Sequence, residues 1–90
     1  MPTVKFTSAL SRFFPTLKEL SVEANSVKEI LEKVEQEYPG IKNYIVDEHG
    51  ALRKHVNIFI NEDLILDKIN LSDSIEENTA VYFMQALSGG

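Results

Sequence analysis

The sequence contains no cysteine, which excludes a disulfide framework, a thiolate nucleophile and any metal site with cysteine ligands. Positive charge is also scarce: 9 Lys and Arg residues stand against 14 Asp and Glu residues, for a formal net charge of −5. Because binding to phosphates depends on clustered Lys and Arg, this balance argues against a nucleic-acid surface. No apolar run approaches the roughly 20 residues of a membrane-spanning helix, and the first residues lack a basic-then-apolar signal pattern. We therefore expect a cytoplasmic protein that binds neither nucleic acid nor membrane.

The motifs of common enzymes are missing as well. The sequence has no G-x-S-x-G nucleophile elbow, no P-loop and no G-x-G-x-x-G loop. A chain of 90 residues predicts one domain with a modest core and little room for an internal ligand cavity. These absences predict a protein that is not an enzyme and binds no cofactor of its own.

The first third of the sequence predicts a β-hairpin. Val4 and Phe6 alternate with polar residues within Met1–Ser8, which is the period of a half-buried strand. Ser11–Pro15 is expected to be a connection, and Leu17–Glu23 predicts a second strand with an imperfect alternation.

The strongest helical signal lies in Ser26–Tyr38. Ser26 and Glu29 have the spacing of a capping box, and Pro39-Gly40 supplies a helix-ending sequence. Apolar residues recur along one stripe of this segment: Val27, Ile30, Leu31, Val34 and Tyr38. The sequence therefore predicts an amphipathic helix that covers a sheet.

Two connecting regions follow the helix. Ile41–Val46 predicts a short helical turn, and Asp47–Gly50 is a polar turn. Asp67–Asn78 is expected to be a loop in which Leu71 and Ile75 serve as apolar anchors.

The strands of the second half complete the predicted fold. His55–Asn61 alternates clearly, Leu64–Leu66 is a short apolar piece, and Thr79–Met84 predicts the last strand. The first and last strands pair in parallel if the helix supplies the crossover between them. The order predicts an α+β protein of the β-grasp, or ubiquitin-like, type, with a mixed sheet of four to five strands and one main helix on one face.

Two groups of polar residues contain side chains that can bind metals or transfer protons. His49 and His55 match no common zinc spacing, and ordinary surface histidines are the favoured interpretation. Glu62, Asp63 and Asp67 lack the pattern of a calcium loop, and a small domain offers little cleft for acid–base work. The sequence thus predicts no metal site and no catalytic residue.

Gly89 and Gly90 occupy the last positions of the sequence, after the final predicted strand. We expect a domain over residues 1–84 and a flexible tail over residues 85–90. Residues without a Cβ can pass through a narrow channel, and a terminal carboxylate becomes a good electrophile once it is adenylated. On a β-grasp domain, such a tail predicts a device for conjugation or for carrying sulfur. An expression remnant or a simple unstructured end is the alternative interpretation.

Several segments in this order carry a family resemblance: Val4-Lys5-Phe6, the Ser26–Tyr38 helix with Pro39-Gly40, the Asp47–Gly50 turn, His55–Asn61 and Gly89-Gly90. Together they resemble the MoaD/ThiS family of ubiquitin-like sulfur carriers over most of the chain. The Val56–Asn61 stretch with Glu62-Asp63 is most similar to the CysO type, which serves cysteine biosynthesis.

The resemblance implies a cycle in which Gly90 reacts and Gly89 gives it reach. An E1-like adenylating enzyme would use ATP and magnesium to adenylate the Gly90 carboxylate, and a sulfurtransferase or another sulfur donor would displace AMP. The resulting thiocarboxylate would pass its sulfur to a client enzyme, which for this type resembles a cysteine synthase. Molybdopterin, thiazole and tRNA thiolation are the other pathways that the family implies. The catalytic groups and the ATP site would belong to partners.

Strand alternation predicts which face meets those partners. Five residues are expected to face the helix: Val56, Ile58, Ile60, Val81 and Phe83. Phe59, Tyr82 and Met84 then lie on the opposite face, which continues toward Leu87 and the tail. We expect these four residues to bind a partner.

Two further functions stay open at this level. A protein modifier would link Gly90 to lysine through an isopeptide bond, using the same fold and tail. A non-catalytic β-grasp subunit would instead insert its tail permanently into a partner enzyme.

Overall fold

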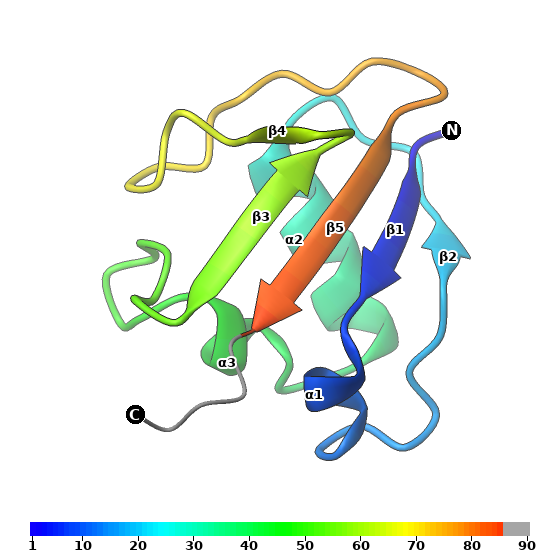
Figure 1. Ribbon diagram of the computed structural model, residues 1–90, viewed down its shortest axis with the longest axis vertical. Coiled ribbons are helices and arrows are strands. Elements are labelled where there is room, and N and C mark those ends of the chain that lie inside the picture. Colours follow the sequence, from blue (N-terminus) through cyan, green and yellow to red (C-terminus); the bar gives the residue numbers. More distant parts are fainter. Residues whose placement is uncertain (86–90) are drawn as a thin grey trace.

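The computed structural model describes residues 1–85, which form a five-stranded mixed sheet with the longest helix on one face (Figure 1). In chain order the elements are β1 (Thr3–Phe6), α1 (Ser8–Ser11), β2 (Leu20–Ser21), α2 (Val27–Glu37), α3 (Lys42–Ile45), β3 (Val56–Ile60), β4 (Asp63–Leu64) and β5 (Ala80–Gln85). The strand order is β2-β1-β5-β3-β4. This arrangement confirms the predicted α+β class and the β-grasp fold.

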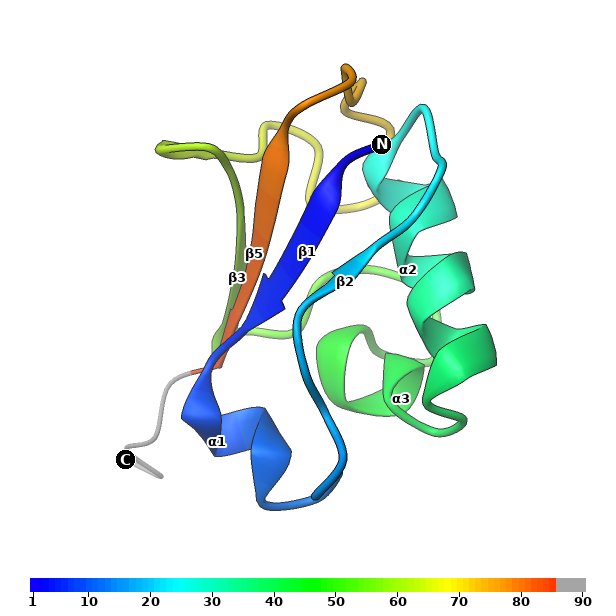
Figure 2. The same cartoon turned by 90° about the vertical axis from the view of Figure 1, so that its right-hand side faces the viewer.

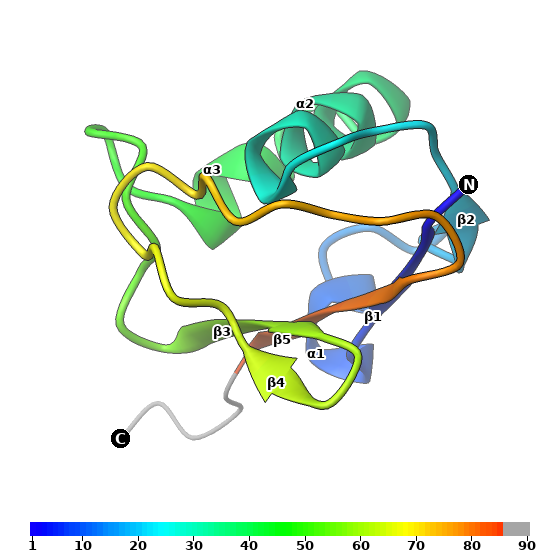
Figure 3. The ribbon, with the colours of Figure 1, turned by 90° about the horizontal axis from the view of Figure 1, so that it is seen from above.

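The two terminal strands pair in parallel at the centre of the sheet, as predicted. Val4 lies opposite Val81 and Phe6 lies opposite Phe83. The outer pairs, β1 with β2, β3 with β5 and β3 with β4, are all antiparallel. Because a parallel pair needs a crossover connection, α2 lies between β1 and β5 in the chain and packs across one face (Figure 3).

The amino end of α2 begins at the predicted cap. Ser26 Oγ accepts the N–H of Glu29 at 3.2 Å, and Glu29 Oε1 accepts the N–H of Asn25 at 2.9 Å. The N–H of Val27, which has no partner within the helix, donates to the carbonyl oxygen of Asp73 at 3.0 Å. The cap and a carbonyl from a distant loop together satisfy the first donors of the helix.

The carboxyl end of α2 is held by a side chain as well as by glycine. Gly40 has a φ of +99°, a region that favours glycine because it has no Cβ. Glu35 Oε2 accepts the N–H of Gly40 and Glu35 Oε1 accepts the N–H of Lys42, each at 2.9 Å. These two hydrogen bonds lower the pKa of the Glu35 carboxyl. They also fix the turn that joins α2 to α3.

The core fills the space between the sheet and α2. Its largest fully buried side chains are Phe83, Leu10, Ile30, Ile41, Ile45, Ile58, Leu71, Val4, Val27, Val34, Val56 and Val81. All five residues expected to face the helix belong to the core cluster or pack against it. The two predicted loop anchors, Leu71 and Ile75, are 2% and 5% exposed. Leu71 reaches its place with a φ of 55°, a conformation that costs a non-glycine residue about 1–3 kcal/mol.

One local prediction is wrong, and another is too long: the strand expected over Leu17–Glu23 is reduced to the two residues of β2, Leu20–Ser21. Met1–Ser8 was expected to be strand to its end and Ser11–Pro15 an irregular connection, but the chain forms the short helix α1. A four-residue helix is too short to show a period in the sequence. Leu10 lies within α1 and is 0% exposed, so this short helix contributes one side chain to the core.

The later strands differ from the prediction only at their ends. β3 is two residues shorter than His55–Asn61, and β4 is Asp63–Leu64, so it shares only Leu64 with the predicted piece Leu64–Leu66. β5 begins at Ala80 instead of Thr79 and includes Gln85. Within residues 1–85, no helix has the length and apolar character needed to cross a bilayer.

Candidate functional site

The expected reacting end of the chain lies outside the described residues. Gly89 and Gly90, together with Leu87 of the expected partner surface, come after residue 85. The described part of the site is therefore the sheet face and the end of β5 that precede them.

Phe59, Tyr82 and Met84 lie together on the sheet face that carries no helix, as the alternation predicts. Phe59 on β3 and Tyr82 on β5 are directly opposite each other in the antiparallel register. Such opposed side chains are close enough to interact across the strands. Phe59 and Tyr82 are half-buried, whereas Met84 is 41% exposed. In Figure 3, α2 lies on one side of the sheet and this face lies on the other.

These three side chains line a shallow, open hollow. Its volume is about 340 Å³, and Asn61 and Glu62 complete its wall. Asn61 has a φ of 56°, donates its N–H to the carbonyl oxygen of Ala80 at 2.7 Å and accepts the N–H of Ala80 at Oδ1 at 3.1 Å. This double contact fixes the β3–β5 pair at the rim of the hollow. We call Phe59, Tyr82 and Met84 the outer-face patch.

The sequence reasoning missed one neighbour of the outer-face patch. Lys5 on β1 lies opposite Tyr82, and its Nζ is 5.4 Å from the centroid of the Tyr82 ring. The same Nζ is 3.9 Å from Glu19 Oε2. The predicted parallel pairing of the first and last strands was a signal for this contact, but the register that sets it is not visible in either strand alone. A cation over the ring face adds polar character to an otherwise apolar and aromatic patch.

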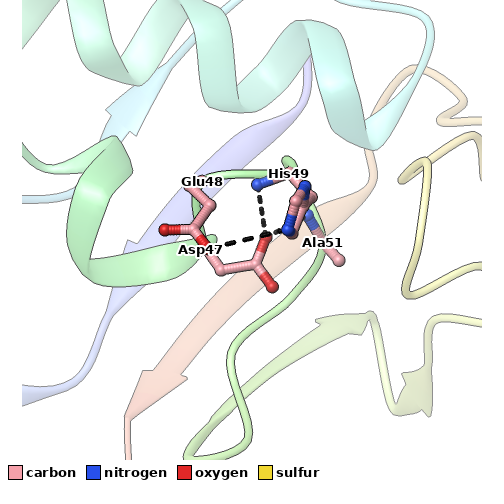
Figure 4. Close-up of polar contacts among 4 residues, drawn as sticks. All are labelled: Asp47, Glu48, His49 and Ala51. Atoms are coloured by element: carbon pink, nitrogen blue, oxygen red, sulfur yellow. Dashed lines mark hydrogen bonds and ion pairs between the residues drawn. The ribbon is translucent and has the colours of Figure 1, made fainter.

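The two histidines do not come together in a metal site. His49 is in the Asp47–Gly50 turn, where Asp47 Oδ1 accepts the N–H groups of His49 at 2.8 Å and Ala51 at 3.1 Å (Figure 4). These hydrogen bonds lower the pKa of the Asp47 carboxyl. His49 Nε2 is 3.6 Å from Glu48 Oε1, and His55 is exposed just before β3. Over residues 1–85, no three potential metal ligands gather at one place.

The acidic residues considered for acid–base work have a structural role in one case. Glu62 and Asp63 are exposed at the β3–β4 turn. The Asp67 carboxylate accepts the N–H groups of Asn70 at 2.9 Å and Ile69 at 3.1 Å, and it also accepts hydrogen bonds from Ser72 Oγ and the Ser72 N–H. These donors, that of Asn70 foremost, lower the pKa of Asp67 to about 2. A carboxylate held in this way organises its loop.

The end of β5 has neighbours on both sides. Val56, at the amino end of β3, lies opposite Gln85. On the other side, the N–H of Thr7 donates to the carbonyl oxygen of Phe83 at 3.1 Å, which brings the start of α1 beside β5. Figure 2 shows α1 at the same end of the sheet as the carboxyl end of β5. The carboxyl end of β5 therefore lies between the start of α1 and the turn before β3.

The family model described as the ThiS family matches residues 6–90 of the chain. No curated protein sequence matches it significantly. The match extends over nearly the whole sequence, including Gly89 and Gly90.

Solved structures share the fold at low sequence identity. A chain of the BexX/CysO complex from Amycolatopsis orientalis superposes with a TM-score of 0.85 at 22% identity, and the alignment covers 100% of both chains. CysO from Mycobacterium tuberculosis gives 0.82 at 22%, covering 97% of this chain and 100% of that one. Small archaeal modifier protein 1 from Methanosarcina acetivorans gives 0.79 at 23%, covering 99% and 95%. At these identities the likeness shows the fold alone.

Proposed function

This chain belongs to the ThiS family of ubiquitin-like sulfur carriers, and we propose that it carries sulfur as a thiocarboxylate on Gly90. The observation that carries the proposal is that the family match covers residues 6–90. It therefore includes Gly89 and Gly90, the two glycines that the chemistry needs. The proposal takes Gly90 as the carboxyl-terminal residue of the working protein.

The proposed cycle assigns one reacting group to this chain. An oxygen of the Gly90 carboxylate attacks the α-phosphorus of ATP on an E1-like enzyme that uses magnesium, and pyrophosphate leaves. Hydrosulfide, or its equivalent from a sulfur donor, attacks the carbonyl carbon of the acyl-adenylate; AMP leaves and the thiol proton is released. The product is a thiocarboxylate, and the catalytic groups belong to the partners.

The outer-face patch supports docking on the activating enzyme. Aromatic and methionine side chains are enriched among residues that anchor protein interfaces. Met84 is 41% exposed on the strand that leads toward Gly90, so a partner that grips this face is close to the start of the tail. The described face thus offers a handle for an enzyme whose chemistry takes place on the tail.

For the client we propose an enzyme of cysteine biosynthesis, in which the sulfur is transferred to an activated serine derivative. This proposal is supported by the fold likeness to two CysO structures, one of them a complex with another protein. The other pathways open to the family are molybdopterin, thiazole and tRNA thiolation. A cytoplasmic location, expected from the sequence, stays a prediction.

A protein modifier is the second candidate function, because the likeness to small archaeal modifier protein 1 has a TM-score of 0.79. It uses the same activation but ends in an isopeptide bond between Gly90 and a lysine. A subunit that inserts its tail permanently into a partner would need no activation at all.

Intact-mass analysis of the protein from its native cell tests these functions. An oxygen-to-sulfur exchange located at Gly90 is the expected result, and lysine-linked adducts would instead show a modifier. An unaltered carboxylate in every growth condition would contradict both and favour the permanently inserted subunit.

A deletion of Gly90 is the matched test in vitro. It should abolish adenylation by the E1-like enzyme, measured as ATP–pyrophosphate exchange, without changing the free energy of unfolding. Ser88→Ala keeps both glycines and the chain length, and as the control it should be adenylated normally. Normal adenylation of the deletion variant would contradict Gly90 as the reacting residue.

A further inference from the structure

Cationic side chains lie beside the carboxyl end of β5, where the tail of the proposed function starts. Val56 is opposite Gln85 in the β3–β5 register, so Lys54 and His55, which immediately precede Val56, lie next to that end. Arg53 begins the same turn, which closes with a hydrogen bond from the Val56 N–H to the Arg53 carbonyl oxygen at 3.1 Å. This short segment places three basic residues on one side of the tail exit.

A fourth basic residue comes from the other side. Because β1 and β5 run in parallel, the carboxyl end of β1 and α1 after it lie at the same end of the sheet as the end of β5 (Figures 1 and 2). Arg12 directly follows α1 and is exposed. We call the four residues the basic cluster: Arg12, Arg53, Lys54 and His55.

The basic cluster is free to meet a partner. All four residues are exposed, and neither of the two ion pairs among residues 1–85 involves them. Arg53 Nε donates to the carbonyl oxygen of Asn43 at 2.9 Å, which holds this guanidinium against α3. Asp47 is an acidic neighbour that interacts electrostatically with Arg53. Its carboxylate, however, already accepts hydrogen bonds from the N–H groups of its own turn (Figure 4).

The cluster stands out against the charge of the whole molecule. The formal net charge is −5. At the opposite end of β3 and β5, acidic residues gather in the connections: Glu62, Asp63, Glu76 and Glu77. A chain that is acidic overall therefore presents exposed basic residues at the carboxyl end of β5.

The length of the tail decides what this charge can touch. The 5 residues 86–90 span at most about 17 Å when fully extended. With Gly90 at a nucleotide inside an enzyme, a fully extended segment of this length would leave the basic cluster at the mouth of the channel. The overall negative charge likewise disfavours a nucleic acid as the occupant.

We propose that the basic cluster docks on an acidic rim around the channel through which the E1-like enzyme receives the tail. This inference rests on the proposed function and adds a second contact surface, on a different side of the tail from the outer-face patch. Opposite charges at the rim raise the rate of encounter and orient the tail toward the channel, an effect that salt screens.

Charge reversal tests the inference. Arg12→Glu with Lys54→Glu should raise the KM for the chain in ATP–pyrophosphate exchange by about tenfold at low salt, with kcat unchanged. The enzyme is the purified E1-like protein of the same organism. The increase should shrink as salt rises above about 0.1 M, where charges more than about 10 Å apart are screened. Lys28→Glu with Lys33→Glu is the matched control, because both lysines are exposed on α2 and the net charge changes equally.

The outcomes separate this inference from the proposed function. If the wild-type chain is not adenylated, both the proposed function and the acidic-rim inference are wrong. If the wild-type chain is adenylated and the two double variants have the same KM, the acidic rim is wrong while the proposed function stands. A loss of kcat with an unchanged KM in the cluster variant would place these cations at the nucleotide and would also overturn the rim. Urea unfolding of each variant checks that the fold is intact.

Discussion

The two faces of the sheet are made by the same strands and differ in almost every physical respect. On the inner face Val4, Ile58, Val81 and Phe83 are each 0% exposed beneath α2. On the outer face the neighbours of these residues include Tyr82, which is half-buried, and Met84, which is 41% exposed. Successive side chains of a strand point to opposite faces, so alternate residues can serve stability and recognition separately. That division leaves the outer face without a covering helix (Figure 3).

Loss of a large inner side chain should have the largest effect. Phe83→Ala is expected to lower the free energy of unfolding by about 3–5 kcal/mol, because it removes a fully buried ring and leaves a cavity. That ring also packs edge-on against Phe6, with 5.7 Å between centroids. Urea unfolding measures the change. Tyr82→Ala, one residue away on the outer face, should cost less than half as much; equal losses would break the contrast between the faces.

Charge on the outer face should affect binding instead of stability. Phe59→Glu and Met84→Glu, made separately, are each expected to raise the KM for adenylation about tenfold, equivalent to about 1.4 kcal/mol, because a carboxylate replaces an apolar anchor. The free energy of unfolding should change by less than about 1 kcal/mol. Ser21→Glu, exposed on the edge strand β2, adds the same charge away from the hollow and serves as the control. Unchanged kinetics in both test variants would contradict the outer-face patch.

The helix that covers the inner face depends on its cap. Ser26→Ala removes the oxygen that accepts the Glu29 N–H and should cost about 1 kcal/mol. Ser21→Ala, where no side-chain hydrogen bond to this helix is involved, is the matched serine variant. The substitution should lower the stability of the helix on the inner face and leave the outer-face patch unchanged. Adenylation of the folded Ser26→Ala protein should therefore keep its wild-type KM.

The smallest effect is expected from acid. Hydrogen bonds hold the pKa of Asp67 at about 2, below the value of about 3.9 for a free Asp. A lowered pKa in the folded state stabilises the protein above about pH 4, and this contribution is lost as the pH falls through 2. The stability difference between wild type and Asp67→Asn should therefore shrink between about pH 4 and pH 2 in urea titrations. A difference that stays constant over this range would show that the loop does not depend on the carboxylate charge.

Much of this architecture was predictable because its signals are local. The Ser26 cap, the apolar stripe of α2 and the alternation in β3 are each written within one segment, and each was found in the structure. The short helix α1 was not predicted, because four residues carry no period and Leu10 is drawn into the core by contacts with distant segments. The φ of 55° at Leu71 was likewise invisible, since burial of this side chain compensates for a conformation that leucine avoids.

In the candidate site, too, local features were predictable from the sequence and contacts between distant segments were not. The sequence placed Phe59 and Tyr82 on one face, but their direct opposition depends on the register between β3 and β5. Lys5 over Tyr82 depends in the same way on the register between β1 and β5.

By itself, then, the sequence determined the main helix and the longer strands, the two faces of each of these strands, the acidic character of the chain and the glycines on which the proposed chemistry depends. Only the tertiary structure decided which residues from separate strands become neighbours. It opposed Phe59 to Tyr82, and it brought α1, which Arg12 follows, and the turn that contains Lys54 to the same end of β5. The physical reason is that periodicity and capping act over a few residues. The register between strands, and the choice of segments that lie together at one end of the sheet, are instead set by the packing of the whole core.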